Sequence, residues 1–469
     1  MRLHVVPSAG FPAIQRAVCP TVARFRSSQG NQGRAAARSA PTARVVAINV
    51  TALAAESSKE LSTPLGRKLF TRPHFGTWFP LSVFALTRLI DFVMISLSAR
   101  TQVALTHTLP GYYVYTPTPA SPGYLDAITN WDGQWYQRIV EQGYAVTAVG
   151  GFEQWAKTFA LNQPPLFPLT VRALMWATGL GFGVSATILN LLAGSVTMLL
   201  LYRLLEPYAG RFVAGSAVAL LSTFVSAPVL QLAYKDGFAL MLIVLAMLLI
   251  ARRRYWYAVV AILALSMTRQ VTPPLAIVIA AHAWTRFRGR QDSPIRRSEV
   301  TAMTAVVVTS IAGLFIWSTV VRLWLGRSDA DSGRGSLASI GRTRFGWFGQ
   351  AYASAGLLGV GLMVTFLLIL VWFAYESRAR NWGPEVRAWL WAYPAFLMVG
   401  TSMMTGQLRY FLAAFPLLLV LVGSPPPHAL PKIRTGIVTF ACLVGLALQW
   451  FWIDHALIMH SENITIWMP

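Results

Sequence analysis

Charged residues and cysteines are both scarce in this chain, and each scarcity excludes a class of protein. Only 12% of the 469 residues are charged, whereas a soluble domain usually carries about 25%. The two cysteines, Cys19 and Cys442, are too few and too far apart for a disulfide framework or a cysteine zinc site. Hydrophobic residues make up 55% of the chain, and the mean hydropathy is +0.52. Apolar runs of about 20 residues recur, so we expect a polytopic membrane protein.

Several sequence motifs of catalysis are also missing. The chain has no P-loop, no H-E-x-x-H pair and no glycine fingerprint for a dinucleotide. Its seven histidines are scattered. We therefore expect no metal and no bound cofactor. No convincing internal repeat is present, although many transporters carry one.

Acidic residues are nearly absent from the first 76 residues, where only Glu56 and Glu60 oppose many Arg and Lys residues. This segment is rich in Ala, Ser and Gly and shows no sustained apolar period, which predicts a disordered basic cytoplasmic tail. Its composition also fits an organelle transit peptide, and no secretory signal peptide is visible. We assign residues 1–76 to the tail and residues 77–469 to a membrane domain.

The apolar runs predict an all-α membrane protein with about eleven transmembrane helices. The predicted crossings are residues 79–99, 183–205, 212–230, 237–251, 256–267, 270–285, 300–323, 352–374, 388–404, 410–423 and 437–453. Several are shorter than a straight span requires, so we expect tilted or broken helices.

Basic residues in the short loops set the orientation. The basic stretches are "RRR" at 252–254, "RFRGRQDSPIRR" at 286–297, "ESRARNWGPEVR" at 376–387 and "PKIR" at 431–434. Placing them and the tail in the cytoplasm gives an internal N-terminus and an external C-terminus. The net charge of +22 is then explained by cytoplasmic loops, and no nucleic-acid partner is expected.

This orientation puts a long loop, residues 100–182, outside the membrane. Within it, residues 164–181 are interpreted as an interfacial or re-entrant helix, because a crossing there would turn "RRR" outward. Residues 256–285 are expected to form a hairpin of two short helices that breaks at 268–274, where two prolines adjoin.

Asp132, in "NWDGQWYQRIVEQGY", is the strongest candidate for chemistry in the external loop. An ionisable group beside the membrane is costly and is often functional. A structural alternative, which is compatible with catalysis, is that Asp132 caps a helix N-terminus or is a satisfied loop carboxylate. The neighbouring Trp131, Trp135 and Tyr136 are interpreted as interfacial aromatics or as surfaces that stack on a sugar.

Basic residues on the same side suggest a phosphate ligand, since arginine binds phosphate oxygens in bidentate fashion. Arg409, Arg269 and Lys235 each lie at an external helix end. The loop 324–351 adds Arg327, Arg334, Arg342 and Arg344, although a solvated basic loop explains these equally well. Arg88 and Asp91, three residues apart in the first crossing, are expected to neutralise each other.

Five stretches, in chain order, resemble the motifs of one enzyme family. They are "WDGQWYQRIVEQGY", "QPPLFPLTVRAL", "AYKDGFALMLIVLAMLLIARRRYW", "SMTRQVTPPL" and "GQLRYFLAAFPLLL". The first is similar to the W-D-x-x-x-(F/Y)-x-x-I-x-x-x-G-Y signature of PIG-V-type mannosyltransferases, which belong to the GT-C glycosyltransferase superfamily. The resemblance runs from about residue 79 to residue 423. The chain departs from the family at Leu166, Lys235 and Asp236, and it lacks the usual proline after Arg269.

The resemblance implies a GT-C type multispan fold with a helical first external loop. It also implies an inverting enzyme that takes a sugar from a polyprenyl-phosphate donor, with Asp132 as the general base. The substrate-binding residues that we assign are Trp131, Trp135, Tyr136, Tyr234, Lys235, Asp236, Arg269, Arg409 and Tyr410. Because Lys235 and Asp236 depart from the family, the reaction class is better specified than the donor sugar and the acceptor.

The abundant Ala, Arg and Gly residues indicate a GC-rich actinobacterial genome. In that setting we expect a plasma-membrane enzyme with an extracytoplasmic site, a polyprenyl-phosphate mannose donor and an envelope glycolipid, glycan or protein acceptor. In a eukaryote the site would face the endoplasmic reticulum lumen. Two alternatives stay open: a transporter or flippase of lipid-linked sugars, and a non-catalytic membrane partner of a transferase.

Overall fold

The computed structural model describes residues 74–144, 160–325, 346–423 and 431–460, apart from positions 107, 110, 111, 292, 402, 404 and 405. These residues form 15 α-helices and one two-stranded antiparallel sheet. They all belong to one compact unit, Ser57–Pro469. The tail up to residue 73 and the four arginines predicted in loop 324–351 lie outside the described residues.

Four helices are long and apolar enough to cross a membrane: α3 (Phe75–Ser98), α8 (Phe182–Ser222), α15 (Trp347–Tyr375) and α19 (Pro431–Trp452). A fifth span results if α12 (Arg297–Ala312) and α13 (Ile316–Leu325), which are bent by 57°, act as one. The expected all-α fold, with several apolar helices long enough to cross a membrane, is therefore confirmed for the described residues, and the number of about eleven crossings stays a prediction. The predicted crossing 212–230 lies mostly within α8, and the remaining predicted crossings form helices too short to be counted by length.

The remaining elements are shorter. They are η1 (Ala99–Thr101), β1 (Thr108–Leu109), β2 (Tyr112–Tyr113), α4 (Tyr124–Ala127), α5 (Asp132–Gln142), α7 (Leu166–Thr178), η2 (Ala227–Leu230), α9 (Asp236–Ala251), α10 (Tyr255–Ser266), α11 (Pro274–Arg288), η4 (Ser377–Trp382), α16 (Pro384–Gly400), α17 (Gln407–Tyr410), η5 (Phe411–Ala414), α18 (Pro416–Val422) and η6 (Ile453–Leu457).

Breaks in the helices occur where the sequence predicts them. Helices α10 and α11 form the predicted pair of short helices, and their break covers residues 267–273. Helix α8 contains a kink at Gly210, where φ is 77°, so it combines two of the predicted crossings. Helix α7 has 13 residues and extends about 20 Å. This length is less than the thickness of a hydrocarbon core, about 30 Å, and it fits the interfacial or re-entrant helix expected for residues 164–181.

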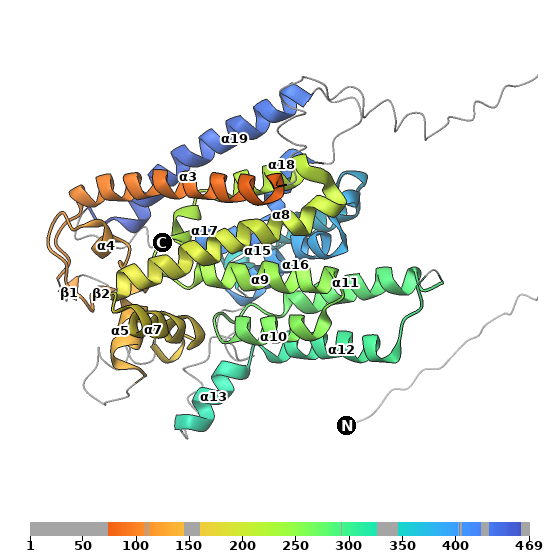
Figure 1. The fold of residues 1–469 in the computed structure, drawn as a ribbon, viewed down its shortest axis with the longest axis horizontal. Helices are drawn as coiled ribbons and strands as arrows, with labels where there is room; N and C mark the ends of the chain where they lie inside the picture. Colours follow the sequence, from red (N-terminus) through yellow and green to blue (C-terminus); the bar gives the residue numbers. More distant parts are fainter. Residues whose placement is uncertain are drawn as a thin grey trace, which may run out of the picture. The chain divides into compact units, whose positions relative to one another are not determined.

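The long helices pack side by side, and different short segments lie at their two ends (Figure 1). Helix α8 packs against α3 and α9, and α11 packs against α12 and α16. The small sheet, α4, α5 and α7 lie at the left end of the helices in Figure 1, and the turn between α11 and α12 lies at the right end. The 16 residues of α9 connect the two ends over about 24 Å. The described part of the long loop and the basic stretches 252–254 and 286–297 therefore lie at opposite ends of the helices, as the predicted orientation requires.

The tight contact between α3 and α8 depends on Gly194. A Cβ atom added there would overlap the ring of Phe84 on α3, which is only 2% exposed. We expect Gly194→Ala to destabilise the fold by about 1–3 kcal/mol, because a packed core must move to accept the methyl group. Thermal unfolding in detergent measures the effect.

Gly361 on α15 is the matched control. A Cβ atom added there meets nothing within 4 Å. Gly361→Ala should therefore be neutral or should stabilise the helix by about 0.5–1 kcal/mol. Equal loss of stability in both variants would contradict the role assigned to Gly194.

Candidate functional site

Asp132 is the first residue of α5, and Trp131 occupies the N-cap position without a side-chain capping bond. The alternative in which Asp132 is the helix cap is therefore wrong, whereas the alternative of a satisfied carboxylate stays open. A carboxylate in the first turn still lies favourably near the positive end of the helix dipole. Trp131 has φ 58° and ψ −115°, a strained conformation for a residue with a side chain. The chain thus bends sharply just before Asp132.

The C-terminal segment holds this bend in place. The indole Nε1 of Trp131 donates to the Leu457 carbonyl at 3.0 Å, and Asn130 Nδ2 donates to the same oxygen at 3.2 Å. The Asn130 carbonyl in turn accepts a hydrogen bond from the Tyr234 hydroxyl at 2.7 Å. Segments that are far apart in the sequence therefore fix the residues before Asp132. No sequence pattern indicates the role of Leu457, because its contribution is a backbone carbonyl.

Arg409 pairs with Asp132. Its Nη2 lies 2.6 Å from Asp132 Oδ2, and the two side chains are 10% and 24% exposed. The guanidinium also lies over the rings of Tyr234 and Tyr410, with its Cζ 5.4 Å and 5.3 Å from the ring centroids. Burial alone would lower the pKa of Arg409, but Asp132 raises it well above its ordinary value. Arg409 is thus a fixed positive charge beside the candidate base.

A second ion pair lies close to the first. Arg269, in the break between α10 and α11, contacts Asp236 Oδ1 at the start of α9. Its guanidinium Cζ lies 4.2 Å from the centroid of the Tyr410 ring. Burial alone would lower the pKa of Arg269, but Asp236 raises it above its ordinary value. Tyr410 contacts both arginines and so joins the two pairs into one cluster.

Lys235 contacts a residue that the sequence analysis did not select. Its Nζ donates to Gln163 Oε1 at 2.5 Å and lies 5.8 Å from the Tyr136 ring centroid. Gln163 also accepts a hydrogen bond from the Tyr136 hydroxyl at 3.2 Å. Burial raises the pKa of Tyr136 well above its ordinary value, so this hydroxyl keeps its proton. Gln163 opens the motif "QPPLFPL", which was the available signal.

A small cavity of about 10 Å³ lies beside the two ion pairs, roughly the room that one water molecule needs. Its lining residues are Asp236, Ala239, Leu240, Ile243, Arg269, Tyr393, Arg409, Leu412 and Ala413. The polar members border the charged cluster, and the apolar members lead into the helices. Tyr393 of α16 was not predicted, because it lies within an apolar run and belongs to none of the five motifs.

The structure brings most of the predicted site residues together. The charged members are three cations, Lys235, Arg269 and Arg409, and two carboxylates, Asp132 and Asp236. One positive charge is therefore in excess, which favours an anionic ligand. Trp131 and Trp135 are 5% and 1% exposed and support the loop from inside the protein. Their predicted contact with substrate stays a prediction.

Among the described residues, no group of three or more His, Cys, Asp or Glu side chains could hold a metal ion. No protein-family model and no curated protein matches the chain. The resemblance to PIG-V-type mannosyltransferases therefore rests on the five motifs alone.

Proposed function

We propose that this chain is a GT-C type glycosyltransferase of the membrane, with about eleven transmembrane helices when the shorter apolar helices are included. It transfers a sugar, with mannose as the expected one, from a polyprenyl-phosphate donor to an envelope glycolipid, glycan or protein. The reaction takes place on the extracytoplasmic face, in an actinobacterial plasma membrane. The observation that carries the proposal is the convergence of Asp132, Asp236, Arg269 and Arg409 at one end of the helices.

The chemistry assigned to these residues is an inverting displacement. An acceptor hydroxyl oxygen attacks the anomeric carbon of the sugar, and the bond from that carbon to the lipid phosphate breaks with its electron pair on the phosphate. Asp132 accepts the hydroxyl proton, which contributes about 10²–10⁴-fold to the rate. Because Arg409 contacts Oδ2, we assign the proton to Oδ1.

The arginines are assigned to the leaving group. Negative charge develops on the phosphate as the bond breaks, and a preorganised cation stabilises that charge better than water does. Arg409 lies between the base and the cavity, so it can serve both the ground-state ion pair and the phosphate. The excess positive charge of the cluster and its position at a membrane boundary support a membrane-borne anionic donor.

A reconstituted assay tests the proposal. Purified protein in liposomes is given a panel of labelled polyprenyl-phosphate sugars and envelope glycan acceptors. We expect labelled product together with free polyprenyl phosphate, with polyprenyl-phosphate mannose as the preferred donor. Movement of intact lipid-linked sugar between leaflets without product would instead support the transporter alternative. Absence of transfer from every donor by a folded preparation would overturn the proposal.

Arg409 gives a second prediction. Arg409→Gln removes the charge next to the phosphate and leaves Asp132 without its partner, so we expect kcat/KM for the lipid donor to fall by about 10²–10³-fold. Arg409→Lys keeps the charge but loses the bidentate geometry, and its loss should be smaller. Initial rates across donor concentrations provide the comparison.

Arg172 is the matched control for this series, because it is exposed on α7. Arg172→Gln should leave kcat/KM within a factor of about two, since it lies in neither ion pair. If Arg409→Gln and Arg172→Gln behave alike, Arg409 does not contact the donor phosphate.

A further inference from the structure

Seven exposed arginines lie at the end of the helices opposite Asp132. They are Arg252, Arg253 and Arg254 between α9 and α10, and Arg288, Arg290, Arg296 and Arg297 around the turn between α11 and α12. We call these seven residues the basic surface. Asp292, within the second group, lies outside the described residues.

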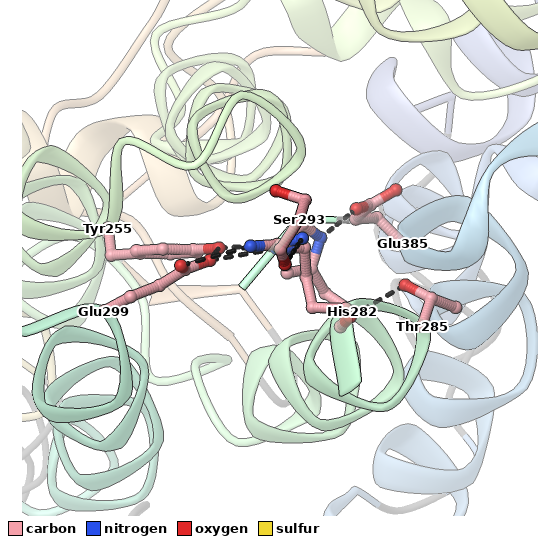
Figure 2. A network of polar contacts seen from close by, with 7 residues as sticks. Tyr255, His282, Thr285, Ser293, Glu299 and Glu385 are labelled. Carbon is pink, nitrogen blue, oxygen red and sulfur yellow. Dashed lines mark hydrogen bonds and ion pairs between the residues drawn. The ribbon is translucent and has the colours of Figure 1, made fainter. Parts of the chain in front are cut away.

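A buried polar network holds the two groups together, and Figure 2 shows its side chains pointing toward one another. The Tyr255 hydroxyl, directly after Arg254, donates to Glu299 Oε1 at 3.1 Å. Arg286 binds the same carboxylate with two hydrogen bonds, of 3.0 Å and 3.2 Å. One carboxylate from α12 therefore fixes the start of α10 and the end of α11. Since Arg286 already neutralises Glu299, this carboxylate does not cancel the exposed charge.

The network also reaches α16. His282 Nδ1 lies 2.5 Å from Glu385 Oε1, and its Nε2 lies 3.0 Å from the Tyr255 hydroxyl. Both His282 and Glu385 are buried, at 5% and 1% exposed. Side chains from four helices are thus locked beneath the basic surface, and a buried network of this kind rigidifies its surroundings. The arginines are presented by a fixed platform and not by independent loops.

Exposed aromatic rings accompany the arginines. Arg288 Cζ lies 4.8 Å from the centroid of the Trp284 ring, and Arg290 Cζ lies 4.0 Å from the centroid of the Phe287 ring. Trp284 and Phe287 are 57% and 48% exposed. Aromatic residues favour the boundary between lipid and water, and a guanidinium stacked on a ring still presents donors to phosphate oxygens. The combination fits a layer of lipid headgroups.

We propose that the basic surface binds the headgroups of anionic phospholipids in the leaflet opposite the candidate site. The exposed rings lie at the ends of apolar helices, where aromatic residues favour the boundary between lipid and water, so a phospholipid fits this surface better than a nucleic acid. This proposal depends on the membrane helices and not on the proposed transferase activity, so either can fail alone.

The test measures the affinity of the purified full-length protein for fluorescent phosphatidylglycerol and fluorescent phosphatidylcholine in neutral detergent micelles. The surface variant is Arg288→Gln with Arg290→Gln. The control is Arg100→Gln with Arg172→Gln, which removes two exposed arginines at the other end. Size exclusion and thermal unfolding verify that each variant is folded.

We expect the wild-type protein to prefer phosphatidylglycerol, and the preference to weaken as salt increases. The surface variant should lose on the order of tenfold in affinity for phosphatidylglycerol, while the control keeps it. Arg288→Lys with Arg290→Lys keeps the charge and should retain most of the affinity. Equal affinity for the two lipids, an equal loss in the control, or competition by an RNA oligonucleotide and not by phosphatidylglycerol would overturn the proposal.

Discussion

Replacing Asp132 with Asn is expected to lower the rate of sugar transfer by about 10²–10⁴-fold, because a general base contributes about that much. The amide nearly matches the carboxylate in shape but cannot accept the acceptor proton. The ion pair with Arg409 is lost as well, so the arginine becomes more available to the donor phosphate. Donor affinity should therefore be kept or should rise while kcat falls. Single-turnover rates and lipid-donor binding, measured on the same preparation, separate the two effects.

Glu141 provides the control, since it is an exposed carboxylate on the same helix. Glu141→Gln should leave the transfer rate within a factor of about two, because exposed substitutions outside a site rarely matter. A transfer rate for Asp132→Asn equal to that of Glu141→Gln would remove Asp132 from the mechanism. A loss of donor binding with an unchanged rate constant would make Asp132 a binding group instead.

Helix positions were the most predictable part of this fold. Residues 237–251 and 256–267 were predicted as crossings, and they correspond to α9 and α10 within a few residues. Long apolar runs and Gly or Pro breaks are local signals, so helix positions can be predicted from them without knowledge of the tertiary fold. What hydropathy could not supply was the tertiary arrangement, including which helices pack against α8 on either side of its break at Gly210.

The charged side chains of the site could be predicted from the sequence, whereas the contacts made by backbone groups could not. Charged residues at helix ends, such as Asp132 and Arg409, stand out in an apolar chain because burying them is costly. Their pairing could not be predicted, since it joins α5 to α17 across more than half of the sequence. The hydrogen bond from Trp131 to the Leu457 carbonyl could not be predicted from the sequence either, because every residue carries a carbonyl group.

The buried pair in α3 is where the largest effect on stability is expected. Arg88 Nη1 lies 2.7 Å from Asp91 Oδ2, and the two side chains are 5% and 0% exposed. Arg88 also donates to the carbonyls of Ala227 and Ser222, at 2.6 Å and 2.8 Å. One side chain therefore neutralises a buried carboxylate and satisfies carbonyl groups where α8 ends. The expected neutralisation of this pair is confirmed, and its bonds to α8 and η2 add a structural role.

Arg88→Met should destabilise the protein by about 3–5 kcal/mol, because it leaves Asp91 buried without a positive partner. Arg88→Met with Asp91→Leu should recover much of that loss, since two apolar residues replace the whole pair. The exposed pair Arg211 and Glu206, separated by 3.3 Å, is the control, and Arg211→Met should cost less than about 1 kcal/mol. Thermal unfolding of the purified variants in one detergent ranks them. If the double variant is no more stable than Arg88→Met, the hydrogen bonds to α8 and η2, and not the charge of Asp91, account for the role of Arg88.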